Sequence, residues 1–418
     1  MKIAFTTLGC KLNYAETSTY ERGFKAAGWE VVPWTAPADV YLVNTCAVTE
    51  TAEKKSRNLI RRAHKTAPGA RIVVTGCYAQ LRREQLLAIE GVWKVFGADE
   101  KSQILSTIVA EWVCAEISVH THSATSSVFG AYSSGERTRS FLKVQDGCDN
   151  FCAYCTVPFA RGRSRSIPIC EAVKSAREIA AKGIKEIVLT GVNTGDFGRR
   201  TGETFLDLLK ALNGVEGIAR YRISSIEPNL ITPEIVDWIA SGTKFQPHFH
   251  IPLQSGSDTL LRKVGRRYDT ALFAGRIDGI RAAMEGPGKP KVFFGIDVIV
   301  GLPGETEELF QETYTFLKER IRPAFIHVFP YSRRPGTRAA EWPDQVPEKL
   351  KTERVARLEA LCAQLHAAFV EANRGVPETV LWESSVKNGL MGGYTGNYIR
   401  MEKKADPALF NTLEAVVL

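Results

Sequence analysis

Short apolar runs that alternate with amphipathic helical stretches recur through most of this chain. In the first hundred residues the runs include KIAFTTLG, DVYLVNTC and RIVVTGC, and six further runs, from FLKVQDG to FIHVFPYS, follow later in the chain. Such alternation is typical of parallel strands joined by crossover helices. We therefore predict an α/β protein with an N-terminal parallel sheet and a central partial (β/α)6 barrel, whose chemistry gathers at the carboxyl ends of its strands.

The composition changes along the chain and predicts its domain boundaries. Residues 1–118 carry the first alternating pattern, and residues 119–135 are rich in Ser, Thr and Gly and are predicted to form a linker. Residues 136–374 carry the six βα repeats and close with a long helical stretch from about Pro347 to Arg374. Residues 375–418 turn to short alternating runs separated by Gly and Asn, which predicts a small C-terminal β-barrel.

Length and composition exclude several classes of protein. The 418 residues are 44% hydrophobic and 24% charged, which is a globular composition and not a disordered one. We find neither a signal peptide nor an apolar run long enough for a membrane span, so we expect no membrane association and place the protein in the reducing cytoplasm. In that compartment nine cysteines indicate free thiols, catalysis or metal binding. The net charge of +8 weakly favours a polyanionic partner.

Three cysteines with CxxxCxxC spacing carry the strongest chemical signal. Cys148, Cys152 and Cys155 follow the first barrel strand in VQDGCDNFCAYC. Three thiolates on one short loop are suited to bind three irons of a cubane cluster and leave the fourth iron open. A zinc knuckle or three unrelated core thiols are the alternatives. The spacing resembles that of the radical S-adenosylmethionine (SAM) superfamily, which implies that SAM chelates the open iron.

Polar groups and glycines at the later strand ends are candidate SAM contacts. Tyr154, beside the last cysteine, is placed to shield the cluster and contact the purine. The alternative for the glycines is ordinary turn chemistry. The remaining candidates are Asn193, Asp196, Glu227, Gln254, Ser255, Gly301 and Gly304.

A second cysteine trio belongs to the N-terminal unit. Cys10, Cys46 and Cys77 each terminate one of its predicted strands. Because parallel strands end at the same edge of a sheet, we expect the three thiols to converge. Convergent thiolates again indicate a cubane cluster with an open iron, and three buried cysteines acting as small hydrophobes are the alternative.

Six segments together resemble the radical-SAM methylthiotransferases, over nearly the whole chain. They are TTLGCK, NTCAVT, GCYAQ, QDGCDNFCAYC, LQSGSD and GYTGNY. The resemblance implies an N-terminal methylthiotransferase domain with an auxiliary [4Fe-4S] cluster, a radical-SAM barrel with a second [4Fe-4S] cluster, and a TRAM-like RNA-binding β-barrel. The tail after Pro377 is short for a TRAM domain.

The segment CKLNYAET and the run around the CxxxCxxC motif are most similar to the branch that acts on tRNA. The implied reaction converts N6-threonylcarbamoyladenosine, beside the anticodon, to its 2-methylthio derivative by radical C–H activation and sulfur insertion. The implied partners are the tRNA anticodon loop and a reducing electron donor, and the sequence does not identify the sulfur donor. Alternatives are methylthiolation of isopentenyladenosine in tRNA or of a ribosomal-protein aspartate, and, more distantly, a non-catalytic iron–sulfur protein that binds RNA.

Basic and aromatic groups offer weaker support for an RNA partner. Cations gather in residues 54–65, 161–165 and 265–268, where they either bind phosphates or form solvated helix faces. Tyr394, Tyr398 and Arg400 are expected to alternate on one strand, either as base-stacking surfaces or as packed core. Two further predictions concern isolated residues. Cys114, Cys170 and Cys362 are predicted core thiols, and His248 or His250 is predicted to face the barrel interior.

Overall fold

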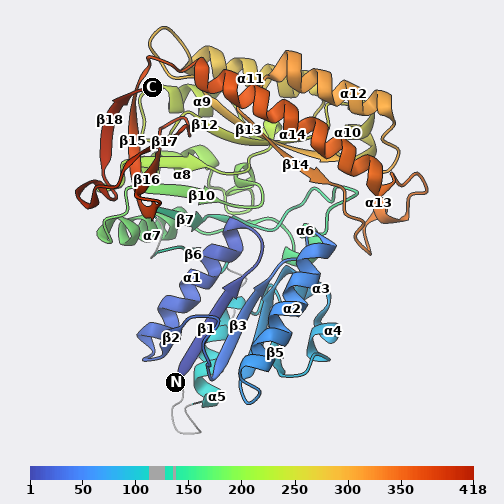
Figure 1. Cartoon of the computed structure of the whole chain (residues 1–418), viewed down its shortest axis with the longest axis vertical. Coiled ribbons are helices and arrows are strands. Elements are labelled where there is room, and N and C mark those ends of the chain that lie inside the picture. Colours follow the sequence, from blue (N-terminus) through green and yellow to red (C-terminus); the bar gives the residue numbers. More distant parts are fainter. Residues whose placement is uncertain (113–127, 135–137) are drawn as a thin grey trace.

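The computed structural model describes residues 1–112, 128–134 and 138–418. It confirms the predicted fold class: an N-terminal parallel sheet, a barrel-like central unit and a small C-terminal sheet follow one another along the chain (Figure 1). Most of the predicted linker and Cys114 lie outside the described residues.

The N-terminal unit is a five-stranded parallel sheet in the order β2-β1-β3-β4-β5. β3 and β4 are almost entirely buried, because helices cover both faces of the sheet. The strands are β1 (Lys2–Thr7), β2 (Glu30–Val32), β3 (Val40–Thr45), β4 (Arg71–Gly76) and β5 (Val92–Val95). The helices are α1 (Lys11–Ala26), α2 (Glu50–Thr66), α3 (Cys77–Leu81), α4 (Arg83–Leu87) and α5 (Ile104–Trp112).

The central unit contains the six predicted parallel strands in two groups. One sheet has the order β11-β10-β7-β6 and the other β12-β13-β14, and a single bridge between Tyr221 and Phe245 joins them. The six strands are β7 (Arg139–Lys143), β10 (Glu186–Thr190), β11 (Arg220–Ile223), β12 (His248–Gln254), β13 (Phe293–Val300) and β14 (Phe325–Pro330). Three short strands accompany them: β6 (Ala131–Tyr132), β8 (Gln145–Asp146) and β9 (Arg165–Ser166).

Helices cover the outer face of these strands and bury a continuous apolar core against them (Figure 1). α14 is the long helix that the sequence predicts, and it packs on β14. Of the other predicted core thiols, Cys362 on α14 is buried, whereas Cys170 on α7 is exposed and that prediction is wrong. The helices are α6 (Val157–Arg161), α7 (Ile169–Ala181), α8 (Phe205–Asn213), α9 (Pro233–Ala240), α10 (Asp258–Val264), α11 (Thr270–Met284), α12 (Glu307–Thr315), α13 (Arg338–Glu341) and α14 (Glu348–Glu371).

The C-terminal unit is an antiparallel sheet in the order β17-β16-β15-β18, curled into a half-barrel. Its strands are β15 (Pro377–Lys387), β16 (Leu390–Tyr394), β17 (Arg400–Lys404) and β18 (Leu413–Val417). It docks on the amino ends of the barrel strands, where Arg222 donates hydrogen bonds to the carbonyls of Thr395 and Gly396.

A buried ionic network joins the N-terminal unit to the barrel. Glu16 of α1 accepts hydrogen bonds from Lys101 at 2.8 Å, from Lys143 of β7 at 2.7 Å and from Arg161 of α6 at 3.3 Å. Asp146 of β8 pairs with Lys143 at 2.7 Å and with Arg161 at 2.8 Å. All five side chains are at most 3% exposed. This network connects α1 and Lys101 of the N-terminal unit to β7, β8 and α6 of the barrel, and β8 and α6 flank the loop that carries the CxxxCxxC motif.

None of the helices in the described ranges combines the length and apolar character that a membrane crossing requires.

Candidate active site

The structure brings Cys10, Cys46 and Cys77 to one edge of the N-terminal sheet. Cys10 is the N-cap of α1, Cys46 directly follows β3, and Cys77 is the first residue of α3 after β4. Because β1, β3 and β4 are adjacent and parallel, their carboxyl ends lie side by side.

Two glycines permit this close approach. A Cβ atom at Gly9, which has φ +105°, would lie 2.9 Å from the Cβ of Cys46 and 3.1 Å from its Sγ. A Cβ atom at Gly76, which has φ +98°, would lie 2.3 Å from the carbonyl oxygen of Thr45. Glycine is therefore required at both turns, by contact and by backbone conformation.

Two thiols of this trio, Cys46 and Cys77, are buried, and Cys10 is exposed. Burial, together with the neighbouring Cys77 and Cys10 sulfurs, raises the pKa of Cys46 to about 11. Burial also raises the pKa of Cys77, against the positive charge of Arg161. Arg161 donates to Asn13 Oδ1 at 2.5 Å, so its guanidinium lies beside the trio. A cationic neighbour suits an anionic thiolate-bound group at this place.

The CxxxCxxC trio lies on the loop between β8 and α6. The backbone N–H of Asn150 donates to Cys148 Sγ at 3.4 Å, and Arg266 Nη1 donates to Cys152 Sγ at 3.3 Å. Burial raises the pKa of Cys148 to about 11 and that of Cys155 to about 12, and the neighbouring sulfurs act in the same direction. Hydrogen bonds to sulfur stabilise thiolates, so the loop fits a thiolate-bound cluster.

Neither trio is built like a site for one ion. Within residues 1–112, 128–134 and 138–418, only His250, Asp297 and His327 bring three ligand atoms within 4.8 Å of one another. Neither cysteine trio meets that spacing, and a cubane cluster, which binds each thiolate through a different iron, does not require it.

Three of the candidate SAM residues gather beside Cys148. Asn193 Nδ2 donates to Asp196 at 3.3 Å, and the backbone N–H of Glu227 donates to Asn193 Oδ1 at 3.1 Å. Asn150 Nδ2 donates to both carboxylate oxygens of Glu227 at 2.8 Å. These groups form a polar, largely acidic wall at the carboxyl ends of β10 and β11.

Tyr154 packs in an apolar group under the loop, and its hydroxyl lies 3.5 Å from Arg266. Arg266 also pairs with Glu227 at 2.8 Å, so one buried guanidinium links a cysteine, an aromatic ring and the acidic wall. The sequence places Arg266 in the basic run 265–268, which is predicted either to bind phosphates or to form a solvated helix face. Its side chain is only 6% exposed, and it serves the cluster loop instead.

The other four candidate SAM residues lie at the ends of β12 and β13 and make no hydrogen bond to the cysteine loop within the described ranges. Ser255 Oγ lies 3.1 Å from the Thr313 hydroxyl, and Gln254 has φ +70°. Gly301 and Gly304 also have positive φ. The side chain of Lys351 lies against Gly301 and that of Lys263 lies against Gly304, where a Cβ atom would otherwise be placed.

A cavity of about 980 Å³ extends between the three units of the protein. Cys10 and Lys11 line it from the N-terminal unit, and Tyr394, Tyr398 and Arg400 line it from the C-terminal unit. The barrel contributes the rest of the wall, including Arg139, Arg222, His248, His250, Phe293 and His327. The sulfur of one cysteine trio and the interior of the barrel therefore open onto one space.

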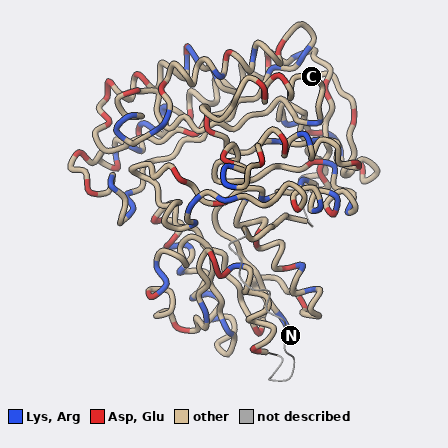
Figure 2. The backbone as a smooth tube through the Cα atoms, turned by 180° about the vertical axis from the view of Figure 1, so that it is seen from behind, with Lys and Arg blue, Asp and Glu red and all other residues tan. Residues whose placement is uncertain are grey.

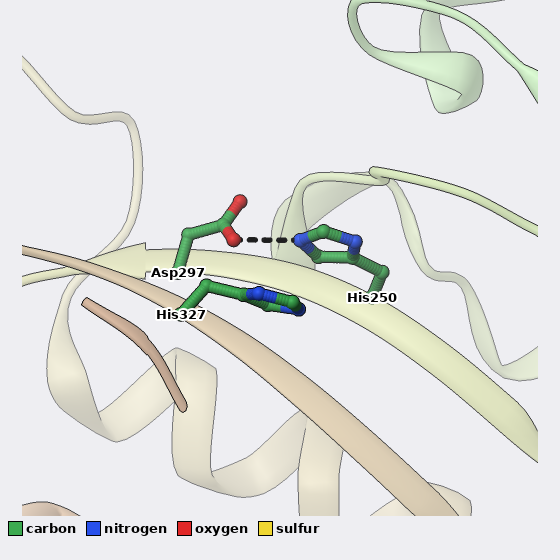
Figure 3. Close-up of side chains that lie close together, drawn as sticks. All are labelled: His250, Asp297 and His327. Atoms are coloured by element: carbon green, nitrogen blue, oxygen red, sulfur yellow. Dashed lines mark hydrogen bonds and ion pairs between the residues drawn. The ribbon is translucent and has the colours of Figure 1, made fainter. Parts of the chain in front are cut away.

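His250 of β12 and His327 of β14 line the barrel side of this cavity, and Asp297 of β13 lies beside them (Figure 3). His250 Nε2 lies 2.7 Å from Asp297 Oδ1, and the rings of His250 and His327 stack with centroids 4.9 Å apart. Gly295 lies opposite His250 across the strand pair and leaves room for the rings. Both predicted histidines, His248 and His250, line the cavity, while Asp297 and His327 were missed because neither belongs to a motif.

The basic groups predicted from sequence differ in their exposure. Lys and Arg are spread over all parts of the chain (Figure 2). On α2, Lys54, Lys55 and Lys65 are exposed, in accord with a cationic surface. Arg161 is 2% exposed and belongs to the ionic network, so its assignment to RNA phosphates is wrong.

The aromatic pair of the C-terminal unit is also arranged differently from the prediction. Tyr394 ends β16, Tyr398 lies in the following turn with φ +66°, and Arg400 begins β17, so the three do not share one strand. The turn stacks the two tyrosine rings with centroids 4.7 Å apart.

Comparisons with known proteins agree with this architecture. Residues 2–97 match the family described as uncharacterized protein family UPF0004, and residues 142–317 match the radical SAM superfamily. Among solved structures, the radical SAM methyltransferase TsrM from Kitasatospora setae superposes with a TM-score of 0.57 at 15% identity, over 81% of this chain and 77% of that one. The likeness supports the fold. These matches define a radical SAM protein with an N-terminal UPF0004 domain.

Curated relatives narrow the family further. The threonylcarbamoyladenosine tRNA methylthiotransferase MtaB of Bacillus subtilis is 41% identical, over 96% of this chain and 89% of its own length. The protein of the same name from Aquifex aeolicus is 39% identical, over 90% of this chain and 91% of its own length. The chain belongs to this family of radical-SAM tRNA methylthiotransferases, the MtaB branch.

Proposed function

We propose that this protein adds a methylthio group to C2 of N6-threonylcarbamoyladenosine beside the anticodon of tRNA. The observation that carries the proposal is the shared cavity: Cys10 of one trio opens onto the interior of the barrel whose loop holds the other. A reaction that joins sulfur to an activated carbon requires the sulfur-bearing trio to face the barrel in which that carbon is activated. The choice of threonylcarbamoyladenosine as the substrate follows the names of the curated relatives.

The two trios are proposed to hold two [4Fe-4S] clusters, with SAM at the open iron of the cluster on Cys148, Cys152 and Cys155. When bound, these groups supply the radical chemistry that an unreactive adenine C–H bond requires, and the auxiliary cluster carries the sulfur. Cys10, Cys46 and Cys77 would hold the auxiliary cluster. An electron donor from outside the chain is required for this chemistry.

The chain's own residues orient and shield this chemistry. The acidic wall of Asn193, Asp196 and Glu227 offers hydrogen-bond acceptors to the amino group and ribose hydroxyls of SAM. Arg266 donates to Cys152 and offsets negative charge on its sulfur. Walls from three units surround the cavity, and such walls limit the access of water that would quench a reactive carbon.

The C-terminal unit is proposed to admit the RNA. Tyr394 and Tyr398 line the cavity from the C-terminal unit. Aromatic rings stack on RNA bases with little dependence on base identity. The exposed lysines of α2 supply charge for the phosphates. A tRNA substrate and free thiols support a cytoplasmic location.

The test is expression of the chain in cells that lack the native enzyme, followed by digestion of bulk tRNA and mass spectrometry. We expect the 2-methylthio derivative of threonylcarbamoyladenosine. Cys77→Ala should abolish this product, and Cys170→Ala, which removes an exposed thiol outside both trios, should retain it.

Two results would contradict the proposal. Methylthio-isopentenyladenosine alone would move the chain to the sibling substrate. RNA binding without any methylthio product would favour the alternative of a non-catalytic iron–sulfur protein that binds RNA.

A further inference from the structure

Lys11 places a positive charge on the wall of the cavity. It is the first residue of α1, directly follows Cys10 and lines the cavity. Its side chain forms no hydrogen bond or ion pair with any residue in the described ranges.

The other cations around the cavity already have partners. Arg139 donates to Glu383 at 2.7 Å, Arg222 donates to Glu186 at 2.9 Å, and Arg400 pairs with Glu402 at 2.7 Å. Each of these guanidiniums is therefore balanced by a carboxylate of the protein.

Asp297, an acidic group inside the barrel, forms no ion pair with Lys11 and is hydrogen-bonded to His250 instead (Figure 3). Burial and the charges of Arg139 and Arg222 disfavour the cationic form of Lys11, whereas the charges of Asp297 and Cys10 favour it. A desolvated cation with no ion-pair partner among the described residues is unfavourable until an anion reaches it, so the cavity is suited to a ligand that carries a negative charge.

We propose that Lys11 binds the carboxylate of the threonylcarbamoyl group on N6 of the target adenosine, an inference that rests on the proposed function. That substituent ends in a carboxylate and a hydroxyl, whereas an isopentenyl substituent is a hydrocarbon with no anion to offer. Lys11 is thus a specificity-determining residue. Because it adjoins Cys10, it holds the substituent close to the place from which sulfur is transferred.

The test measures binding by fluorescence anisotropy with the anaerobically reconstituted holoenzyme. Three labelled anticodon stem-loops differ only at the target base: threonylcarbamoyladenosine, its carboxamide analogue, and unmodified adenosine. The carboxamide keeps the size and hydrogen-bonding groups of the substituent and removes its charge. We expect the wild type to bind the carboxylate RNA about tenfold or more tightly than the carboxamide RNA, which is the scale of one charge-assisted hydrogen bond.

Variants assign the preference to one side chain. Lys11→Met should bind the carboxylate and carboxamide RNAs equally, and Lys11→Arg should keep a preference. Lys210→Met removes a positive charge from the exposed face of α8 and should retain the wild-type preference. Iron content and the electron paramagnetic resonance (EPR) spectrum of each variant establish that its clusters match those of the wild type.

The outcomes separate this inference from the proposed function. Equal binding of the two RNAs by the wild type, together with methylthiolation of threonylcarbamoyladenosine, overturns the role of Lys11 and leaves the function standing. An unchanged preference in Lys11→Met has the same meaning. Absence of the methylthio product from the wild type overturns the function itself. The wild-type comparison needs no variant, so a poorly folded Lys11→Met does not remove the test.

Discussion

Glu16→Gln should destabilise the joint between the N-terminal unit and the barrel. Glu16 is fully buried and accepts hydrogen bonds from Lys101, Lys143 and Arg161. The network holds three cations and two carboxylates, a balance of 3 − 2 = +1. Glutamine keeps the shape of the side chain and raises the balance to +2 among side chains that are at most 3% exposed.

Removing one partner of a buried ion pair costs about 3–5 kcal/mol, because the remaining charges stay desolvated. Asp146 still neutralises part of the charge, so we expect a loss of about 3 kcal/mol. Urea unfolding followed by circular dichroism measures it. The matched control is Glu30→Gln, whose partner Lys2 lies 4.0 Å away at the surface and whose loss should cost about 0.5 kcal/mol or less. A loss for Glu16→Gln as small as that of the control would refute the reasoning.

Three further predictions use other parts of the site. The cations of the network hold the pKa values of Glu16 and Asp146 below their ordinary values, so the contribution of these carboxylates to stability is present above about pH 5 and is lost as pH falls. The free energy of unfolding, measured at a series of acidic pH values, should therefore fall with pH. In Glu16→Gln this dependence on pH should be weaker. Gly76→Ala places a Cβ against Thr45 and should halve the iron bound after reconstitution, whereas an unchanged iron content would show that the turn adapts. Arg266→Gln removes the positive charge that donates to Cys152 and should lower that cluster's reduction potential by roughly 60 mV in an EPR-monitored titration, and the absence of a shift would contradict its role.

Much of the fold follows from local patterns in the sequence. Alternating runs identify the parallel strands of both large units, and the common edge of parallel strands accounts for the convergence of Cys10, Cys46 and Cys77. The same rule gathers Asn193 and Glu227 beside Cys148. These features depend on where strands end and on strands being parallel, which the alternation of strands and helices indicates.

Long-range pairing is not visible in periodicity. Arg161 looks like part of a basic run, yet its carboxylate partner Glu16 lies 145 positions earlier in the chain, and nothing local marks the two as neighbours. Tyr394 and Tyr398 look like alternate positions of a strand, but the positive φ of Tyr398 places a turn between them. The position of Lys11 on the wall of a cavity depends on the packing of three units, which the sequence around Lys11 does not indicate.

The central claim is that six cysteines hold two separate clusters, and an iron count on anaerobically reconstituted protein tests it most directly. We predict about eight irons per chain in the wild type and about four in Cys46→Ala, with the EPR signal of the SAM-binding cluster retained in that variant. A wild type that holds only about four irons, or a Cys46→Ala variant that holds as many as the wild type, would contradict the account.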